Sequence, residues 1–131
     1  MRRSVIAATL VLSLVALVEA GRVLAKASTT KVGFLIPSQC KPEEGVKPEP
    51  KGATDAWPAP HTTACALRPA CIESGYGLWV EDRFFRLDEA GQKDALEYFR
   101  TTRRTSYNKV RLTGDFSDPQ AVKVESLELT D

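Results

Sequence analysis

Three cysteines and one histidine are the residues of this 131-residue chain best suited to specific chemistry. His61, Cys65 and Cys71 lie in the segment HTTACALRPACIESGYG, and Cys40 lies upstream in IPSQCKPEEG. Thiolate and imidazole groups bind zinc and copper, and paired thiols form disulfides in oxidising compartments. The residues therefore suit a metal centre, a haem or dithiol redox site, or a structural disulfide.

Haem attachment and dithiol redox chemistry are disfavoured by the order and spacing of these residues. Covalent c-type haem attachment requires Cys-x-x-Cys-His, whereas His61 precedes both cysteines and five residues separate Cys65 from Cys71. Thioredoxin-type redox chemistry requires Cys-x-x-Cys at the start of a helix, so the same spacing argues against it. A single reactive thiol stays open, because one cysteine is left over after one bridge forms.

A metal site is compatible with part of the pattern. His61 and Cys65 are four residues apart, which would place both ligands on one face of a helix. A break at Pro69 would turn Cys71 back towards them, and Cys40 would complete a Cys₃His site for zinc or copper. The short Cys-x₂₋₄-Cys knuckle is missing, and thiolate metal sites are less common in oxidising compartments, so we rank metal binding as the alternative.

A disulfide is the interpretation that the sequence favours, if the chain is exported. The pairings 40–65, 40–71 and 65–71 are all open. A bridge from Cys40, with Cys65 as the preferred partner, would close a loop of about 25 to 30 residues and stabilise the fold by roughly 3–4 kcal/mol. His61 would then cap or hydrogen-bond the start of the helix, with a pH-sensing role as the less favoured reading.

The residues expected of an enzyme active site are not arranged as catalysis requires. The lone His61 has no visible serine and carboxylate partners for a hydrolytic triad, and it shares one local element with Cys65, whereas catalytic pairs usually converge from different elements. Acidic pairs at 81–82 and 88–89 fall at predicted turns, where such residues are ordinary. We therefore expect no enzymatic activity.

Residues 1–25 have the layout of a secretory signal peptide. Arg2 and Arg3 precede 14 uncharged residues from Val5 to Val18, and small residues at cleavage spacing follow as far as Ala25. This stretch is shorter than the roughly 20 apolar residues that span a bilayer. We therefore expect a periplasmic or secreted protein, with residues 26–131 forming a single small domain and no membrane span after cleavage.

The charge balance excludes a general affinity for polyanions. The chain has 18 basic and 17 acidic residues, and removal of the leader leaves the balance close to zero. Such a balance provides no electrostatic attraction to DNA, RNA or an anionic membrane. We therefore expect no nucleic-acid partner.

Hydrophobic periodicity predicts five strands and two helical segments around a proline-rich loop. Val32, Phe34 and Ile36 are expected to form one face of the first strand, with Leu35 on a partly covered second face. A slip in the inward phase near Glu125 predicts a β-bulge in the last strand. The predicted strands are 31–37, 76–82, 83–87, 108–116 and 121–129, the loop is 38–60, and the helical segments are a broken one at 62–73 and a regular one at 92–102.

This order indicates a mainly β fold with two short helical segments. Five strands with a helix between the third and fourth match a five-stranded OB-like, partly open barrel, in which the helix would plug one end. The alternative is an open antiparallel sheet with a helix packed on one face. The sequence contains no internal repeat and no nucleotide-binding glycine pattern.

Several segments together resemble a family of small exported bacterial domains, the OB-fold-like envelope proteins of uncharacterised function. The resemblance rests on VGFLIPSQC, HTTACALRPACIESGYGLWV, FFRLDEAG and KVRLTGDF followed by VKVESLEL, and it covers nearly all of the predicted mature chain. It implies a barrel-like fold and a place in the bacterial envelope. The long proline-rich insert between Cys40 and His61 departs from the family pattern.

A ligand-binding face is the last expectation. OB-folds bind oligosaccharides and oligonucleotides on strands 2 and 3, a region that here holds Tyr76 and Trp79. Trp79 is out of phase with Leu78, so it is either exposed and able to stack on a sugar or covered by the proline-rich loop. Arg103 and Arg104 could add an anion site, although cations after a helix end are ordinary. We expect a glycan, anion or protein ligand.

Overall fold

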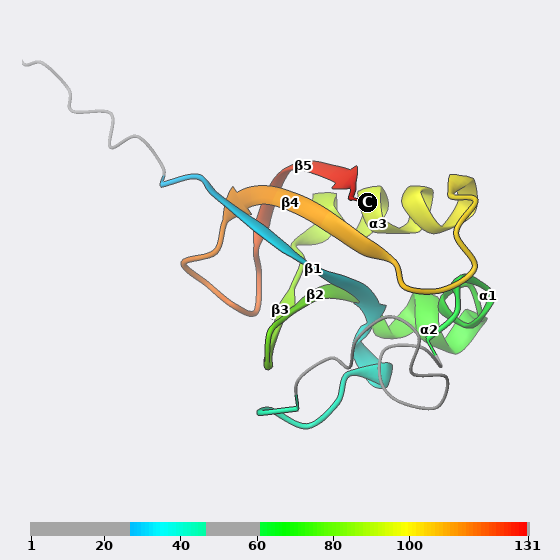
Figure 1. Cartoon of the computed structure of the whole chain (residues 1–131). Helices are drawn as coiled ribbons and strands as arrows, with labels where there is room; N and C mark the ends of the chain where they lie inside the picture. The colour runs from blue at the N-terminus through cyan, green and yellow to red at the C-terminus, as the bar shows by residue number, and fades with distance from the viewer. Residues whose placement is uncertain (1–26, 47–60, 131) are drawn as a thin grey trace, which may run out of the picture.

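The computed structural model describes residues 27–46 and 61–130 (Figure 1). The predicted signal peptide, residues 1–25, and most of the predicted proline-rich loop lie outside the described residues. The described chain is mainly β and follows the predicted order of strands and helical segments. Its elements are β1 (Thr29–Pro37), the 3-10 helix η1 (Ser38–Cys40), α1 (Thr63–Ala66), α2 (Pro69–Ser74), β2 (Tyr76–Val80), β3 (Arg83–Arg86), α3 (Glu89–Thr101), β4 (Lys109–Asp115) and β5 (Lys123–Leu129).

The five strands form one open antiparallel sheet in the order β3-β2-β1-β4-β5. β1 lies in the middle, between β2 and β4 (Figure 1). Pro37 at the end of β1 pairs with Tyr76 at the start of β2. In an antiparallel pair, the chain that leaves one strand runs beside the chain that enters the other. The residues after Pro37 therefore lie next to those before Tyr76, which brings η1 against α2.

The last strand contains the predicted bulge. Thr113 pairs with Ser126 and Gly114 with Val124, so Glu125 is the extra residue, which confirms the phase slip expected from the sequence. A bulge increases the local twist of a strand pair. Beyond it, a single parallel bridge joins Leu87 to Val122. This bridge links the two ends of the sheet at one place, and the five strands remain an open sheet.

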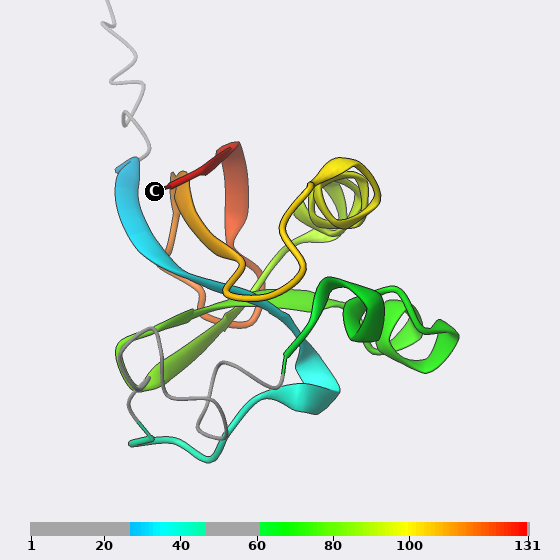
Figure 2. The same ribbon diagram turned by 45° about the vertical axis from the view of Figure 1, so that its right-hand side comes forward.

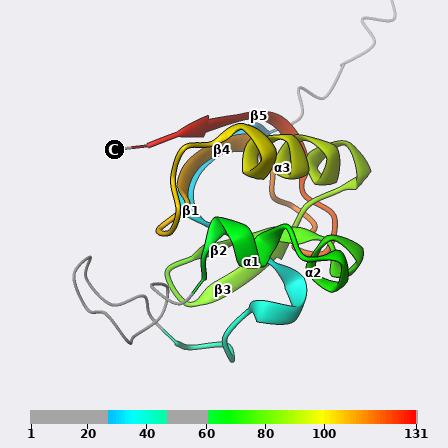
Figure 3. The same cartoon turned by 90° about the vertical axis from the view of Figure 1, so that its right-hand side faces the viewer.

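The hydrophobic core lies between the sheet and α3, which packs along one face of the sheet (Figure 3). Ala95, Tyr98 and Phe99 of α3 are buried in the core. The ring of Phe99 lies 5.1 Å from that of Tyr76, centroid to centroid. The buried core residues are Leu35, Ala66, Tyr76, Leu78, Phe85, Leu87, Ala95, Tyr98, Phe99, Val110, Leu112 and Val122.

Two details of the strand faces differ from the sequence-based expectation. In β1, Leu35 lies in the core opposite Leu78, whereas Val32 is 41% exposed. Ile36, on the predicted inward face, is also buried at 1% exposure, so both faces of β1 are covered near its end and only Val32 departs clearly from the prediction. In β5, Leu129 is 51% exposed. It is the last residue of an edge strand, where the core no longer covers it.

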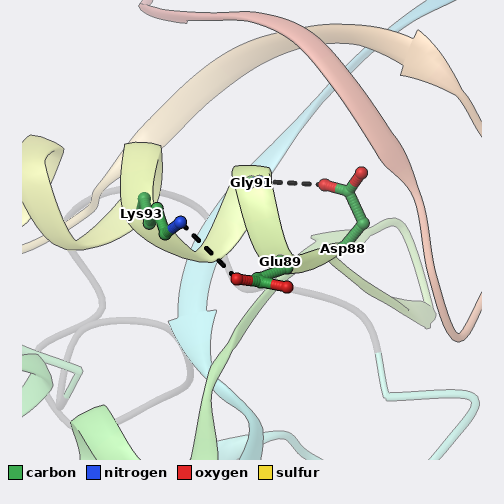
Figure 4. A network of polar contacts seen from close by, with 4 residues as sticks. All are labelled: Asp88, Glu89, Gly91 and Lys93. Carbon is green, nitrogen blue, oxygen red and sulfur yellow. Dashed lines mark hydrogen bonds and ion pairs between the residues drawn. The ribbon is translucent and has the colours of Figure 1, made fainter.

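The first turn of α3 is stabilised by polar contacts (Figure 4). The carboxylate of Asp88 accepts a hydrogen bond from the Gly91 amide at 2.8 Å, which is the standard N-cap arrangement. Lys93 and Glu89 form an exposed ion pair at 3.5 Å, one helical turn apart. Helix α3 thus begins at residue 89, three residues before the predicted start.

The broken helical connector before β2 also forms as predicted. Pro69 occupies the first turn of α2, where a missing amide hydrogen costs nothing, and the backbone turns between α1 and α2. Gly75 ends α2 with a φ of 77°. Within residues 27–46 and 61–130, the longest helix is too short and too polar to cross a membrane.

Candidate metal centre: a cluster of three cysteines

The three cysteines converge at one corner of the molecule, beside the end of β1. The Sγ atoms of Cys40, Cys65 and Cys71 all lie within 4.8 Å of one another. They come from three elements, η1, α1 and α2, which lie together in Figure 2. All three are free thiols; Cys71 is 2% exposed, whereas Cys40 and Cys65 are half-buried. We call this group the sulfur cluster.

Hydrogen bonds between η1 and α2 hold Cys40 and Cys71 in place. The Ser38 amide donates to the Gly75 carbonyl at 2.7 Å, and the Gln39 amide donates to the Ser74 hydroxyl at 3.4 Å. These contacts continue the pairing of β1 with β2 past the last residues of the ladder. The sheet register therefore determines the separation of the two cysteines, although 30 residues lie between them in the sequence.

Arg86 of β3 fastens the same two segments. Its guanidinium Nη1 donates to the Ser38 hydroxyl at 2.7 Å and to the Ser74 carbonyl at 2.8 Å. A Cβ at Gly75 would lie 2.6 Å from the other guanidinium nitrogen, so a larger residue there would displace the end of the Arg86 side chain. The positive φ of Gly75 adds a second reason for glycine.

Helix α1, which carries Cys65, is anchored to the rest of the domain at both ends. The Thr62 hydroxyl caps it by accepting a hydrogen bond from the Cys65 amide at 3.1 Å. The Tyr76 hydroxyl donates to the Ala66 carbonyl at 2.7 Å. On the other side, the Asn108 side chain donates to the Thr63 hydroxyl at 3.1 Å. Four residues could not form a stable helix alone, so these contacts hold Cys65 in position.

The sulfur atoms influence one another electrostatically. Burial, together with the neighbouring Cys71 and Cys65 thiols, raises the pKa of Cys40 from 9.0 to about 11. Cys40 therefore carries its proton at neutral pH, and a bound cation would have to displace that proton. The Gln39 side-chain amide donates to the Cys71 Sγ at 3.1 Å, so this sulfur already has a hydrogen-bond donor suited to a thiolate.

His61 does not belong to the sulfur cluster. Among the described residues, the group of potential ligands within mutual reach contains the three cysteines and no histidine or carboxylate. Thr62, rather than His61, supplies the side-chain cap of α1, which corrects the capping role expected of His61. The alternative, a hydrogen bond from His61 to the start of this helix, stays a prediction. Burial lowers the pKa of His61, so the neutral imidazole is favoured.

The expected ligand face is only partly present. Trp79 is 0% exposed and its indole N–H donates to the Glu81 carbonyl at 3.1 Å, and Tyr76 is a core residue, so neither aromatic ring is available for stacking on a sugar. This corrects the prediction of an exposed, stacking Trp79; whether the proline-rich loop covers it stays a prediction, because residues 47–60 lie outside the described residues.

The two arginines of that expected face have different environments. The Arg104 guanidinium donates to the carbonyls of Tyr107, Lys109 and Thr130, so it ties the chain after α3 to the end of β5. Arg103 is exposed. Both line a cavity of about 570 Å³ that also includes Leu67 and Phe99.

Sequence reasoning identified all three members of the sulfur cluster and missed the residues that position them. Ser38, Ser74 and Arg86 carry no motif, because an isolated serine or arginine reads as an ordinary surface residue. The one available signal for Gln39 is its position directly before Cys40.

Comparisons with protein-family models, curated proteins and solved structures gave no match. The resemblance to OB-fold-like envelope proteins therefore stays a prediction from the sequence. The chemistry of the site has to be inferred from the arrangement of its own residues.

Proposed function

We propose that this chain is a small exported protein that binds a thiophilic metal ion, zinc or copper, through Cys40, Cys65 and Cys71. The observation that carries this proposal is the convergence of three Sγ atoms within 4.8 Å from three separate elements. A structural disulfide uses two cysteines, so it does not explain why a third cysteine lies beside them. Three sulfur atoms at one point match the donor set that soft metal ions prefer.

The spacing of the sulfur atoms is close to that of a metal-bound set. With metal–sulfur bonds of about 2.3 Å, three sulfur ligands lie roughly 3.8 to 4.0 Å apart. The sulfur atoms of the cluster, all within 4.8 Å of one another, would have to approach by about 1 Å or less. Side-chain rotation of the half-buried Cys40 and Cys65 is sufficient for a movement of this size.

We infer the location of the protein and its fold class from other observations. The signal-peptide layout of residues 1–25 supports a periplasmic or secreted location. The order of the strands, α3 between β3 and β4, and the parallel bridge of Leu87 to Val122 support an OB-like, partly open barrel. The domain would act by binding, without catalysis and without a nucleic-acid partner.

The test combines thiol counting with metal analysis of the purified mature protein. The native protein should contain one zinc or copper per chain, and three thiols should become reactive once the metal is chelated under reducing conditions. Replacing Cys71 with serine should abolish the bound metal while the circular dichroism spectrum stays that of the wild type. Two thiols missing without reductant, and no metal before or after reduction, would reject the proposal.

A disulfide-stapled binding domain is the second candidate function, and the same closeness of the sulfur atoms favours it. Side-chain rotation could bring two of them to bonding distance in an oxidising compartment. Peptide mapping under non-reducing conditions would identify the pair, for which we expect Cys40 with Cys65 or Cys71. Oxidation would then remove two ligands, so a stable disulfide and a tightly bound metal exclude one another.

A further inference from the structure

We propose that the ion bound by the sulfur cluster is monovalent copper, coordinated by the three cysteine sulfur atoms and without His61. This inference rests on the proposed metal-binding function and specifies its ion and its ligands. Two features of the site carry it: the number of donors and their chemical type.

The number of donors separates copper from zinc. Structural zinc sites are almost always tetrahedral with four protein ligands. Among the residues that the structure describes, only Cys40, Cys65 and Cys71 lie within mutual reach. Monovalent copper has a filled d shell and accepts three sulfur ligands in a trigonal arrangement. The ligands found among residues 27–46 and 61–130 therefore complete the coordination of copper and are one fewer than a structural zinc site uses.

The chemical type of the donors also favours monovalent copper. Thiolates are soft ligands, and a site built from sulfur alone selects soft ions such as Cu(I), whereas imidazole and carboxylate ligands suit divalent ions as well. The Gln39 amide, 3.1 Å from the Cys71 Sγ, is a second-shell donor that would orient this sulfur and spread its negative charge. Cys71 is buried at the back of the site, while Cys40 and Cys65 are half-buried, so an ion enters from their side.

The test is an anaerobic titration of the reduced mature protein with Cu(I) buffered by a colour-forming chelator, and a parallel titration with zinc. The wild type should bind one Cu(I), outcompete the chelator, and develop sulfur-to-copper charge-transfer absorption in the ultraviolet. Second-shell changes at metal sites commonly cost 10- to 100-fold in affinity, so loss of a direct ligand by Cys40→Ser, Cys65→Ser or Cys71→Ser should cost more than about 100-fold.

His61→Ala is the matched control, because His61 is the one other residue that the sequence offers as a ligand near the cysteines. Copper affinity of this variant should stay within about threefold of the wild type, because the substitution keeps the three sulfur ligands and the Gln39 donor. X-ray absorption of the copper-loaded protein should show a shell of three sulfur atoms and no nitrogen.

The outcomes separate this inference from the proposed function. A loss of copper affinity in His61→Ala comparable to that of the cysteine variants, or a mixed sulfur and nitrogen shell, would overturn the three-sulfur site. Tighter binding of zinc than of Cu(I) would overturn the choice of ion and leave the metal-binding function standing. Failure of both ions to bind the folded, reduced protein would overturn both proposals.

Discussion

The sulfur cluster and the hydrophobic core are two regions held together by different forces. The core between the sheet and α3 consists of apolar and aromatic side chains, almost all fully buried, so it is stabilised by burial. The sulfur cluster lies at the edge of the fold and is held by directed hydrogen bonds from Ser38, Gln39 and Arg86. This difference indicates that the fold can form without the cluster, while the cluster depends on the fold.

The first prediction tests the core side of that comparison and has the largest expected effect. Phe99→Ala should lower the free energy of unfolding by about 3–5 kcal/mol, because Phe99 is 2% exposed and its ring packs on Tyr76 and Tyr98. Chemical denaturation measures the change. Val32→Ala is the control, with an expected change within about 0.5 kcal/mol at this exposed site. Equal losses in the two variants would contradict the placement of the core.

The second prediction separates the cluster from the core. Arg86→Met keeps much of the side-chain volume and removes the hydrogen bonds to Ser38 and Ser74. It should destabilise the protein by about 1.5–3 kcal/mol, the usual range for hydrogen bonds from a charged group. It should also weaken metal binding, because η1 and α2 lose the contact that joins them. Unfolding curves and a metal titration of the same samples measure both effects. Unchanged metal affinity in this variant would show that metal binding does not need the Arg86 hydrogen bonds to Ser38 and Ser74.

The third prediction concerns pH. The folded-state pKa of Cys40 is about 11 and its ordinary value is 9.0, so the folded protein holds this proton more tightly than the unfolded chain does. Stability of the reduced, metal-free protein should therefore be unaffected by this group below pH 9 and should fall as the pH rises from 9 to about 11.

Tyr76 and Tyr98, whose pKa values burial also raises, add to the fall at the upper end of this range. The contribution of Cys40 is the difference between the wild type and Cys40→Ser, measured by denaturation at each pH. Parallel curves for the two proteins between pH 9 and 11 would contradict a buried, interacting thiol at this position.

The smallest expected effect belongs to a residue outside both regions. Arg103 is exposed and is not a ligand of the sulfur cluster, so Arg103→Ala should change stability by no more than about 0.5 kcal/mol and leave metal affinity unchanged. The same two measurements apply. A clear loss of metal in this variant would show that the cluster is sensitive to changes throughout the domain and would weaken the proposed separation of the two regions.

Much of the fold could be predicted because local signals agree with it. Pro69 and Gly75 mark the ends of α2, and the slip of hydrophobic phase at Glu125 marks the bulge. The exposure of individual strand residues was harder to predict from the sequence. Val32 and Leu35 are both apolar, so alternation alone cannot say which of them faces the core, and the pairing of Leu35 with Leu78 decides it. The sequence also left the burial of Trp79 undecided, since that burial depends on neighbours distant in the sequence.

The sequence by itself determined the types of side chain available for chemistry and the elements that carry them: three cysteines, one histidine and a connector broken at Pro69. Tertiary structure decided which of them meet. Pairing of Pro37 with Tyr76 and the contacts of Arg86 bring Cys40 to Cys71, and the anchoring of α1 adds Cys65. The physical reason is that ligands meet through strand register and long-range hydrogen bonds, which depend on residues with no pattern of their own in the sequence.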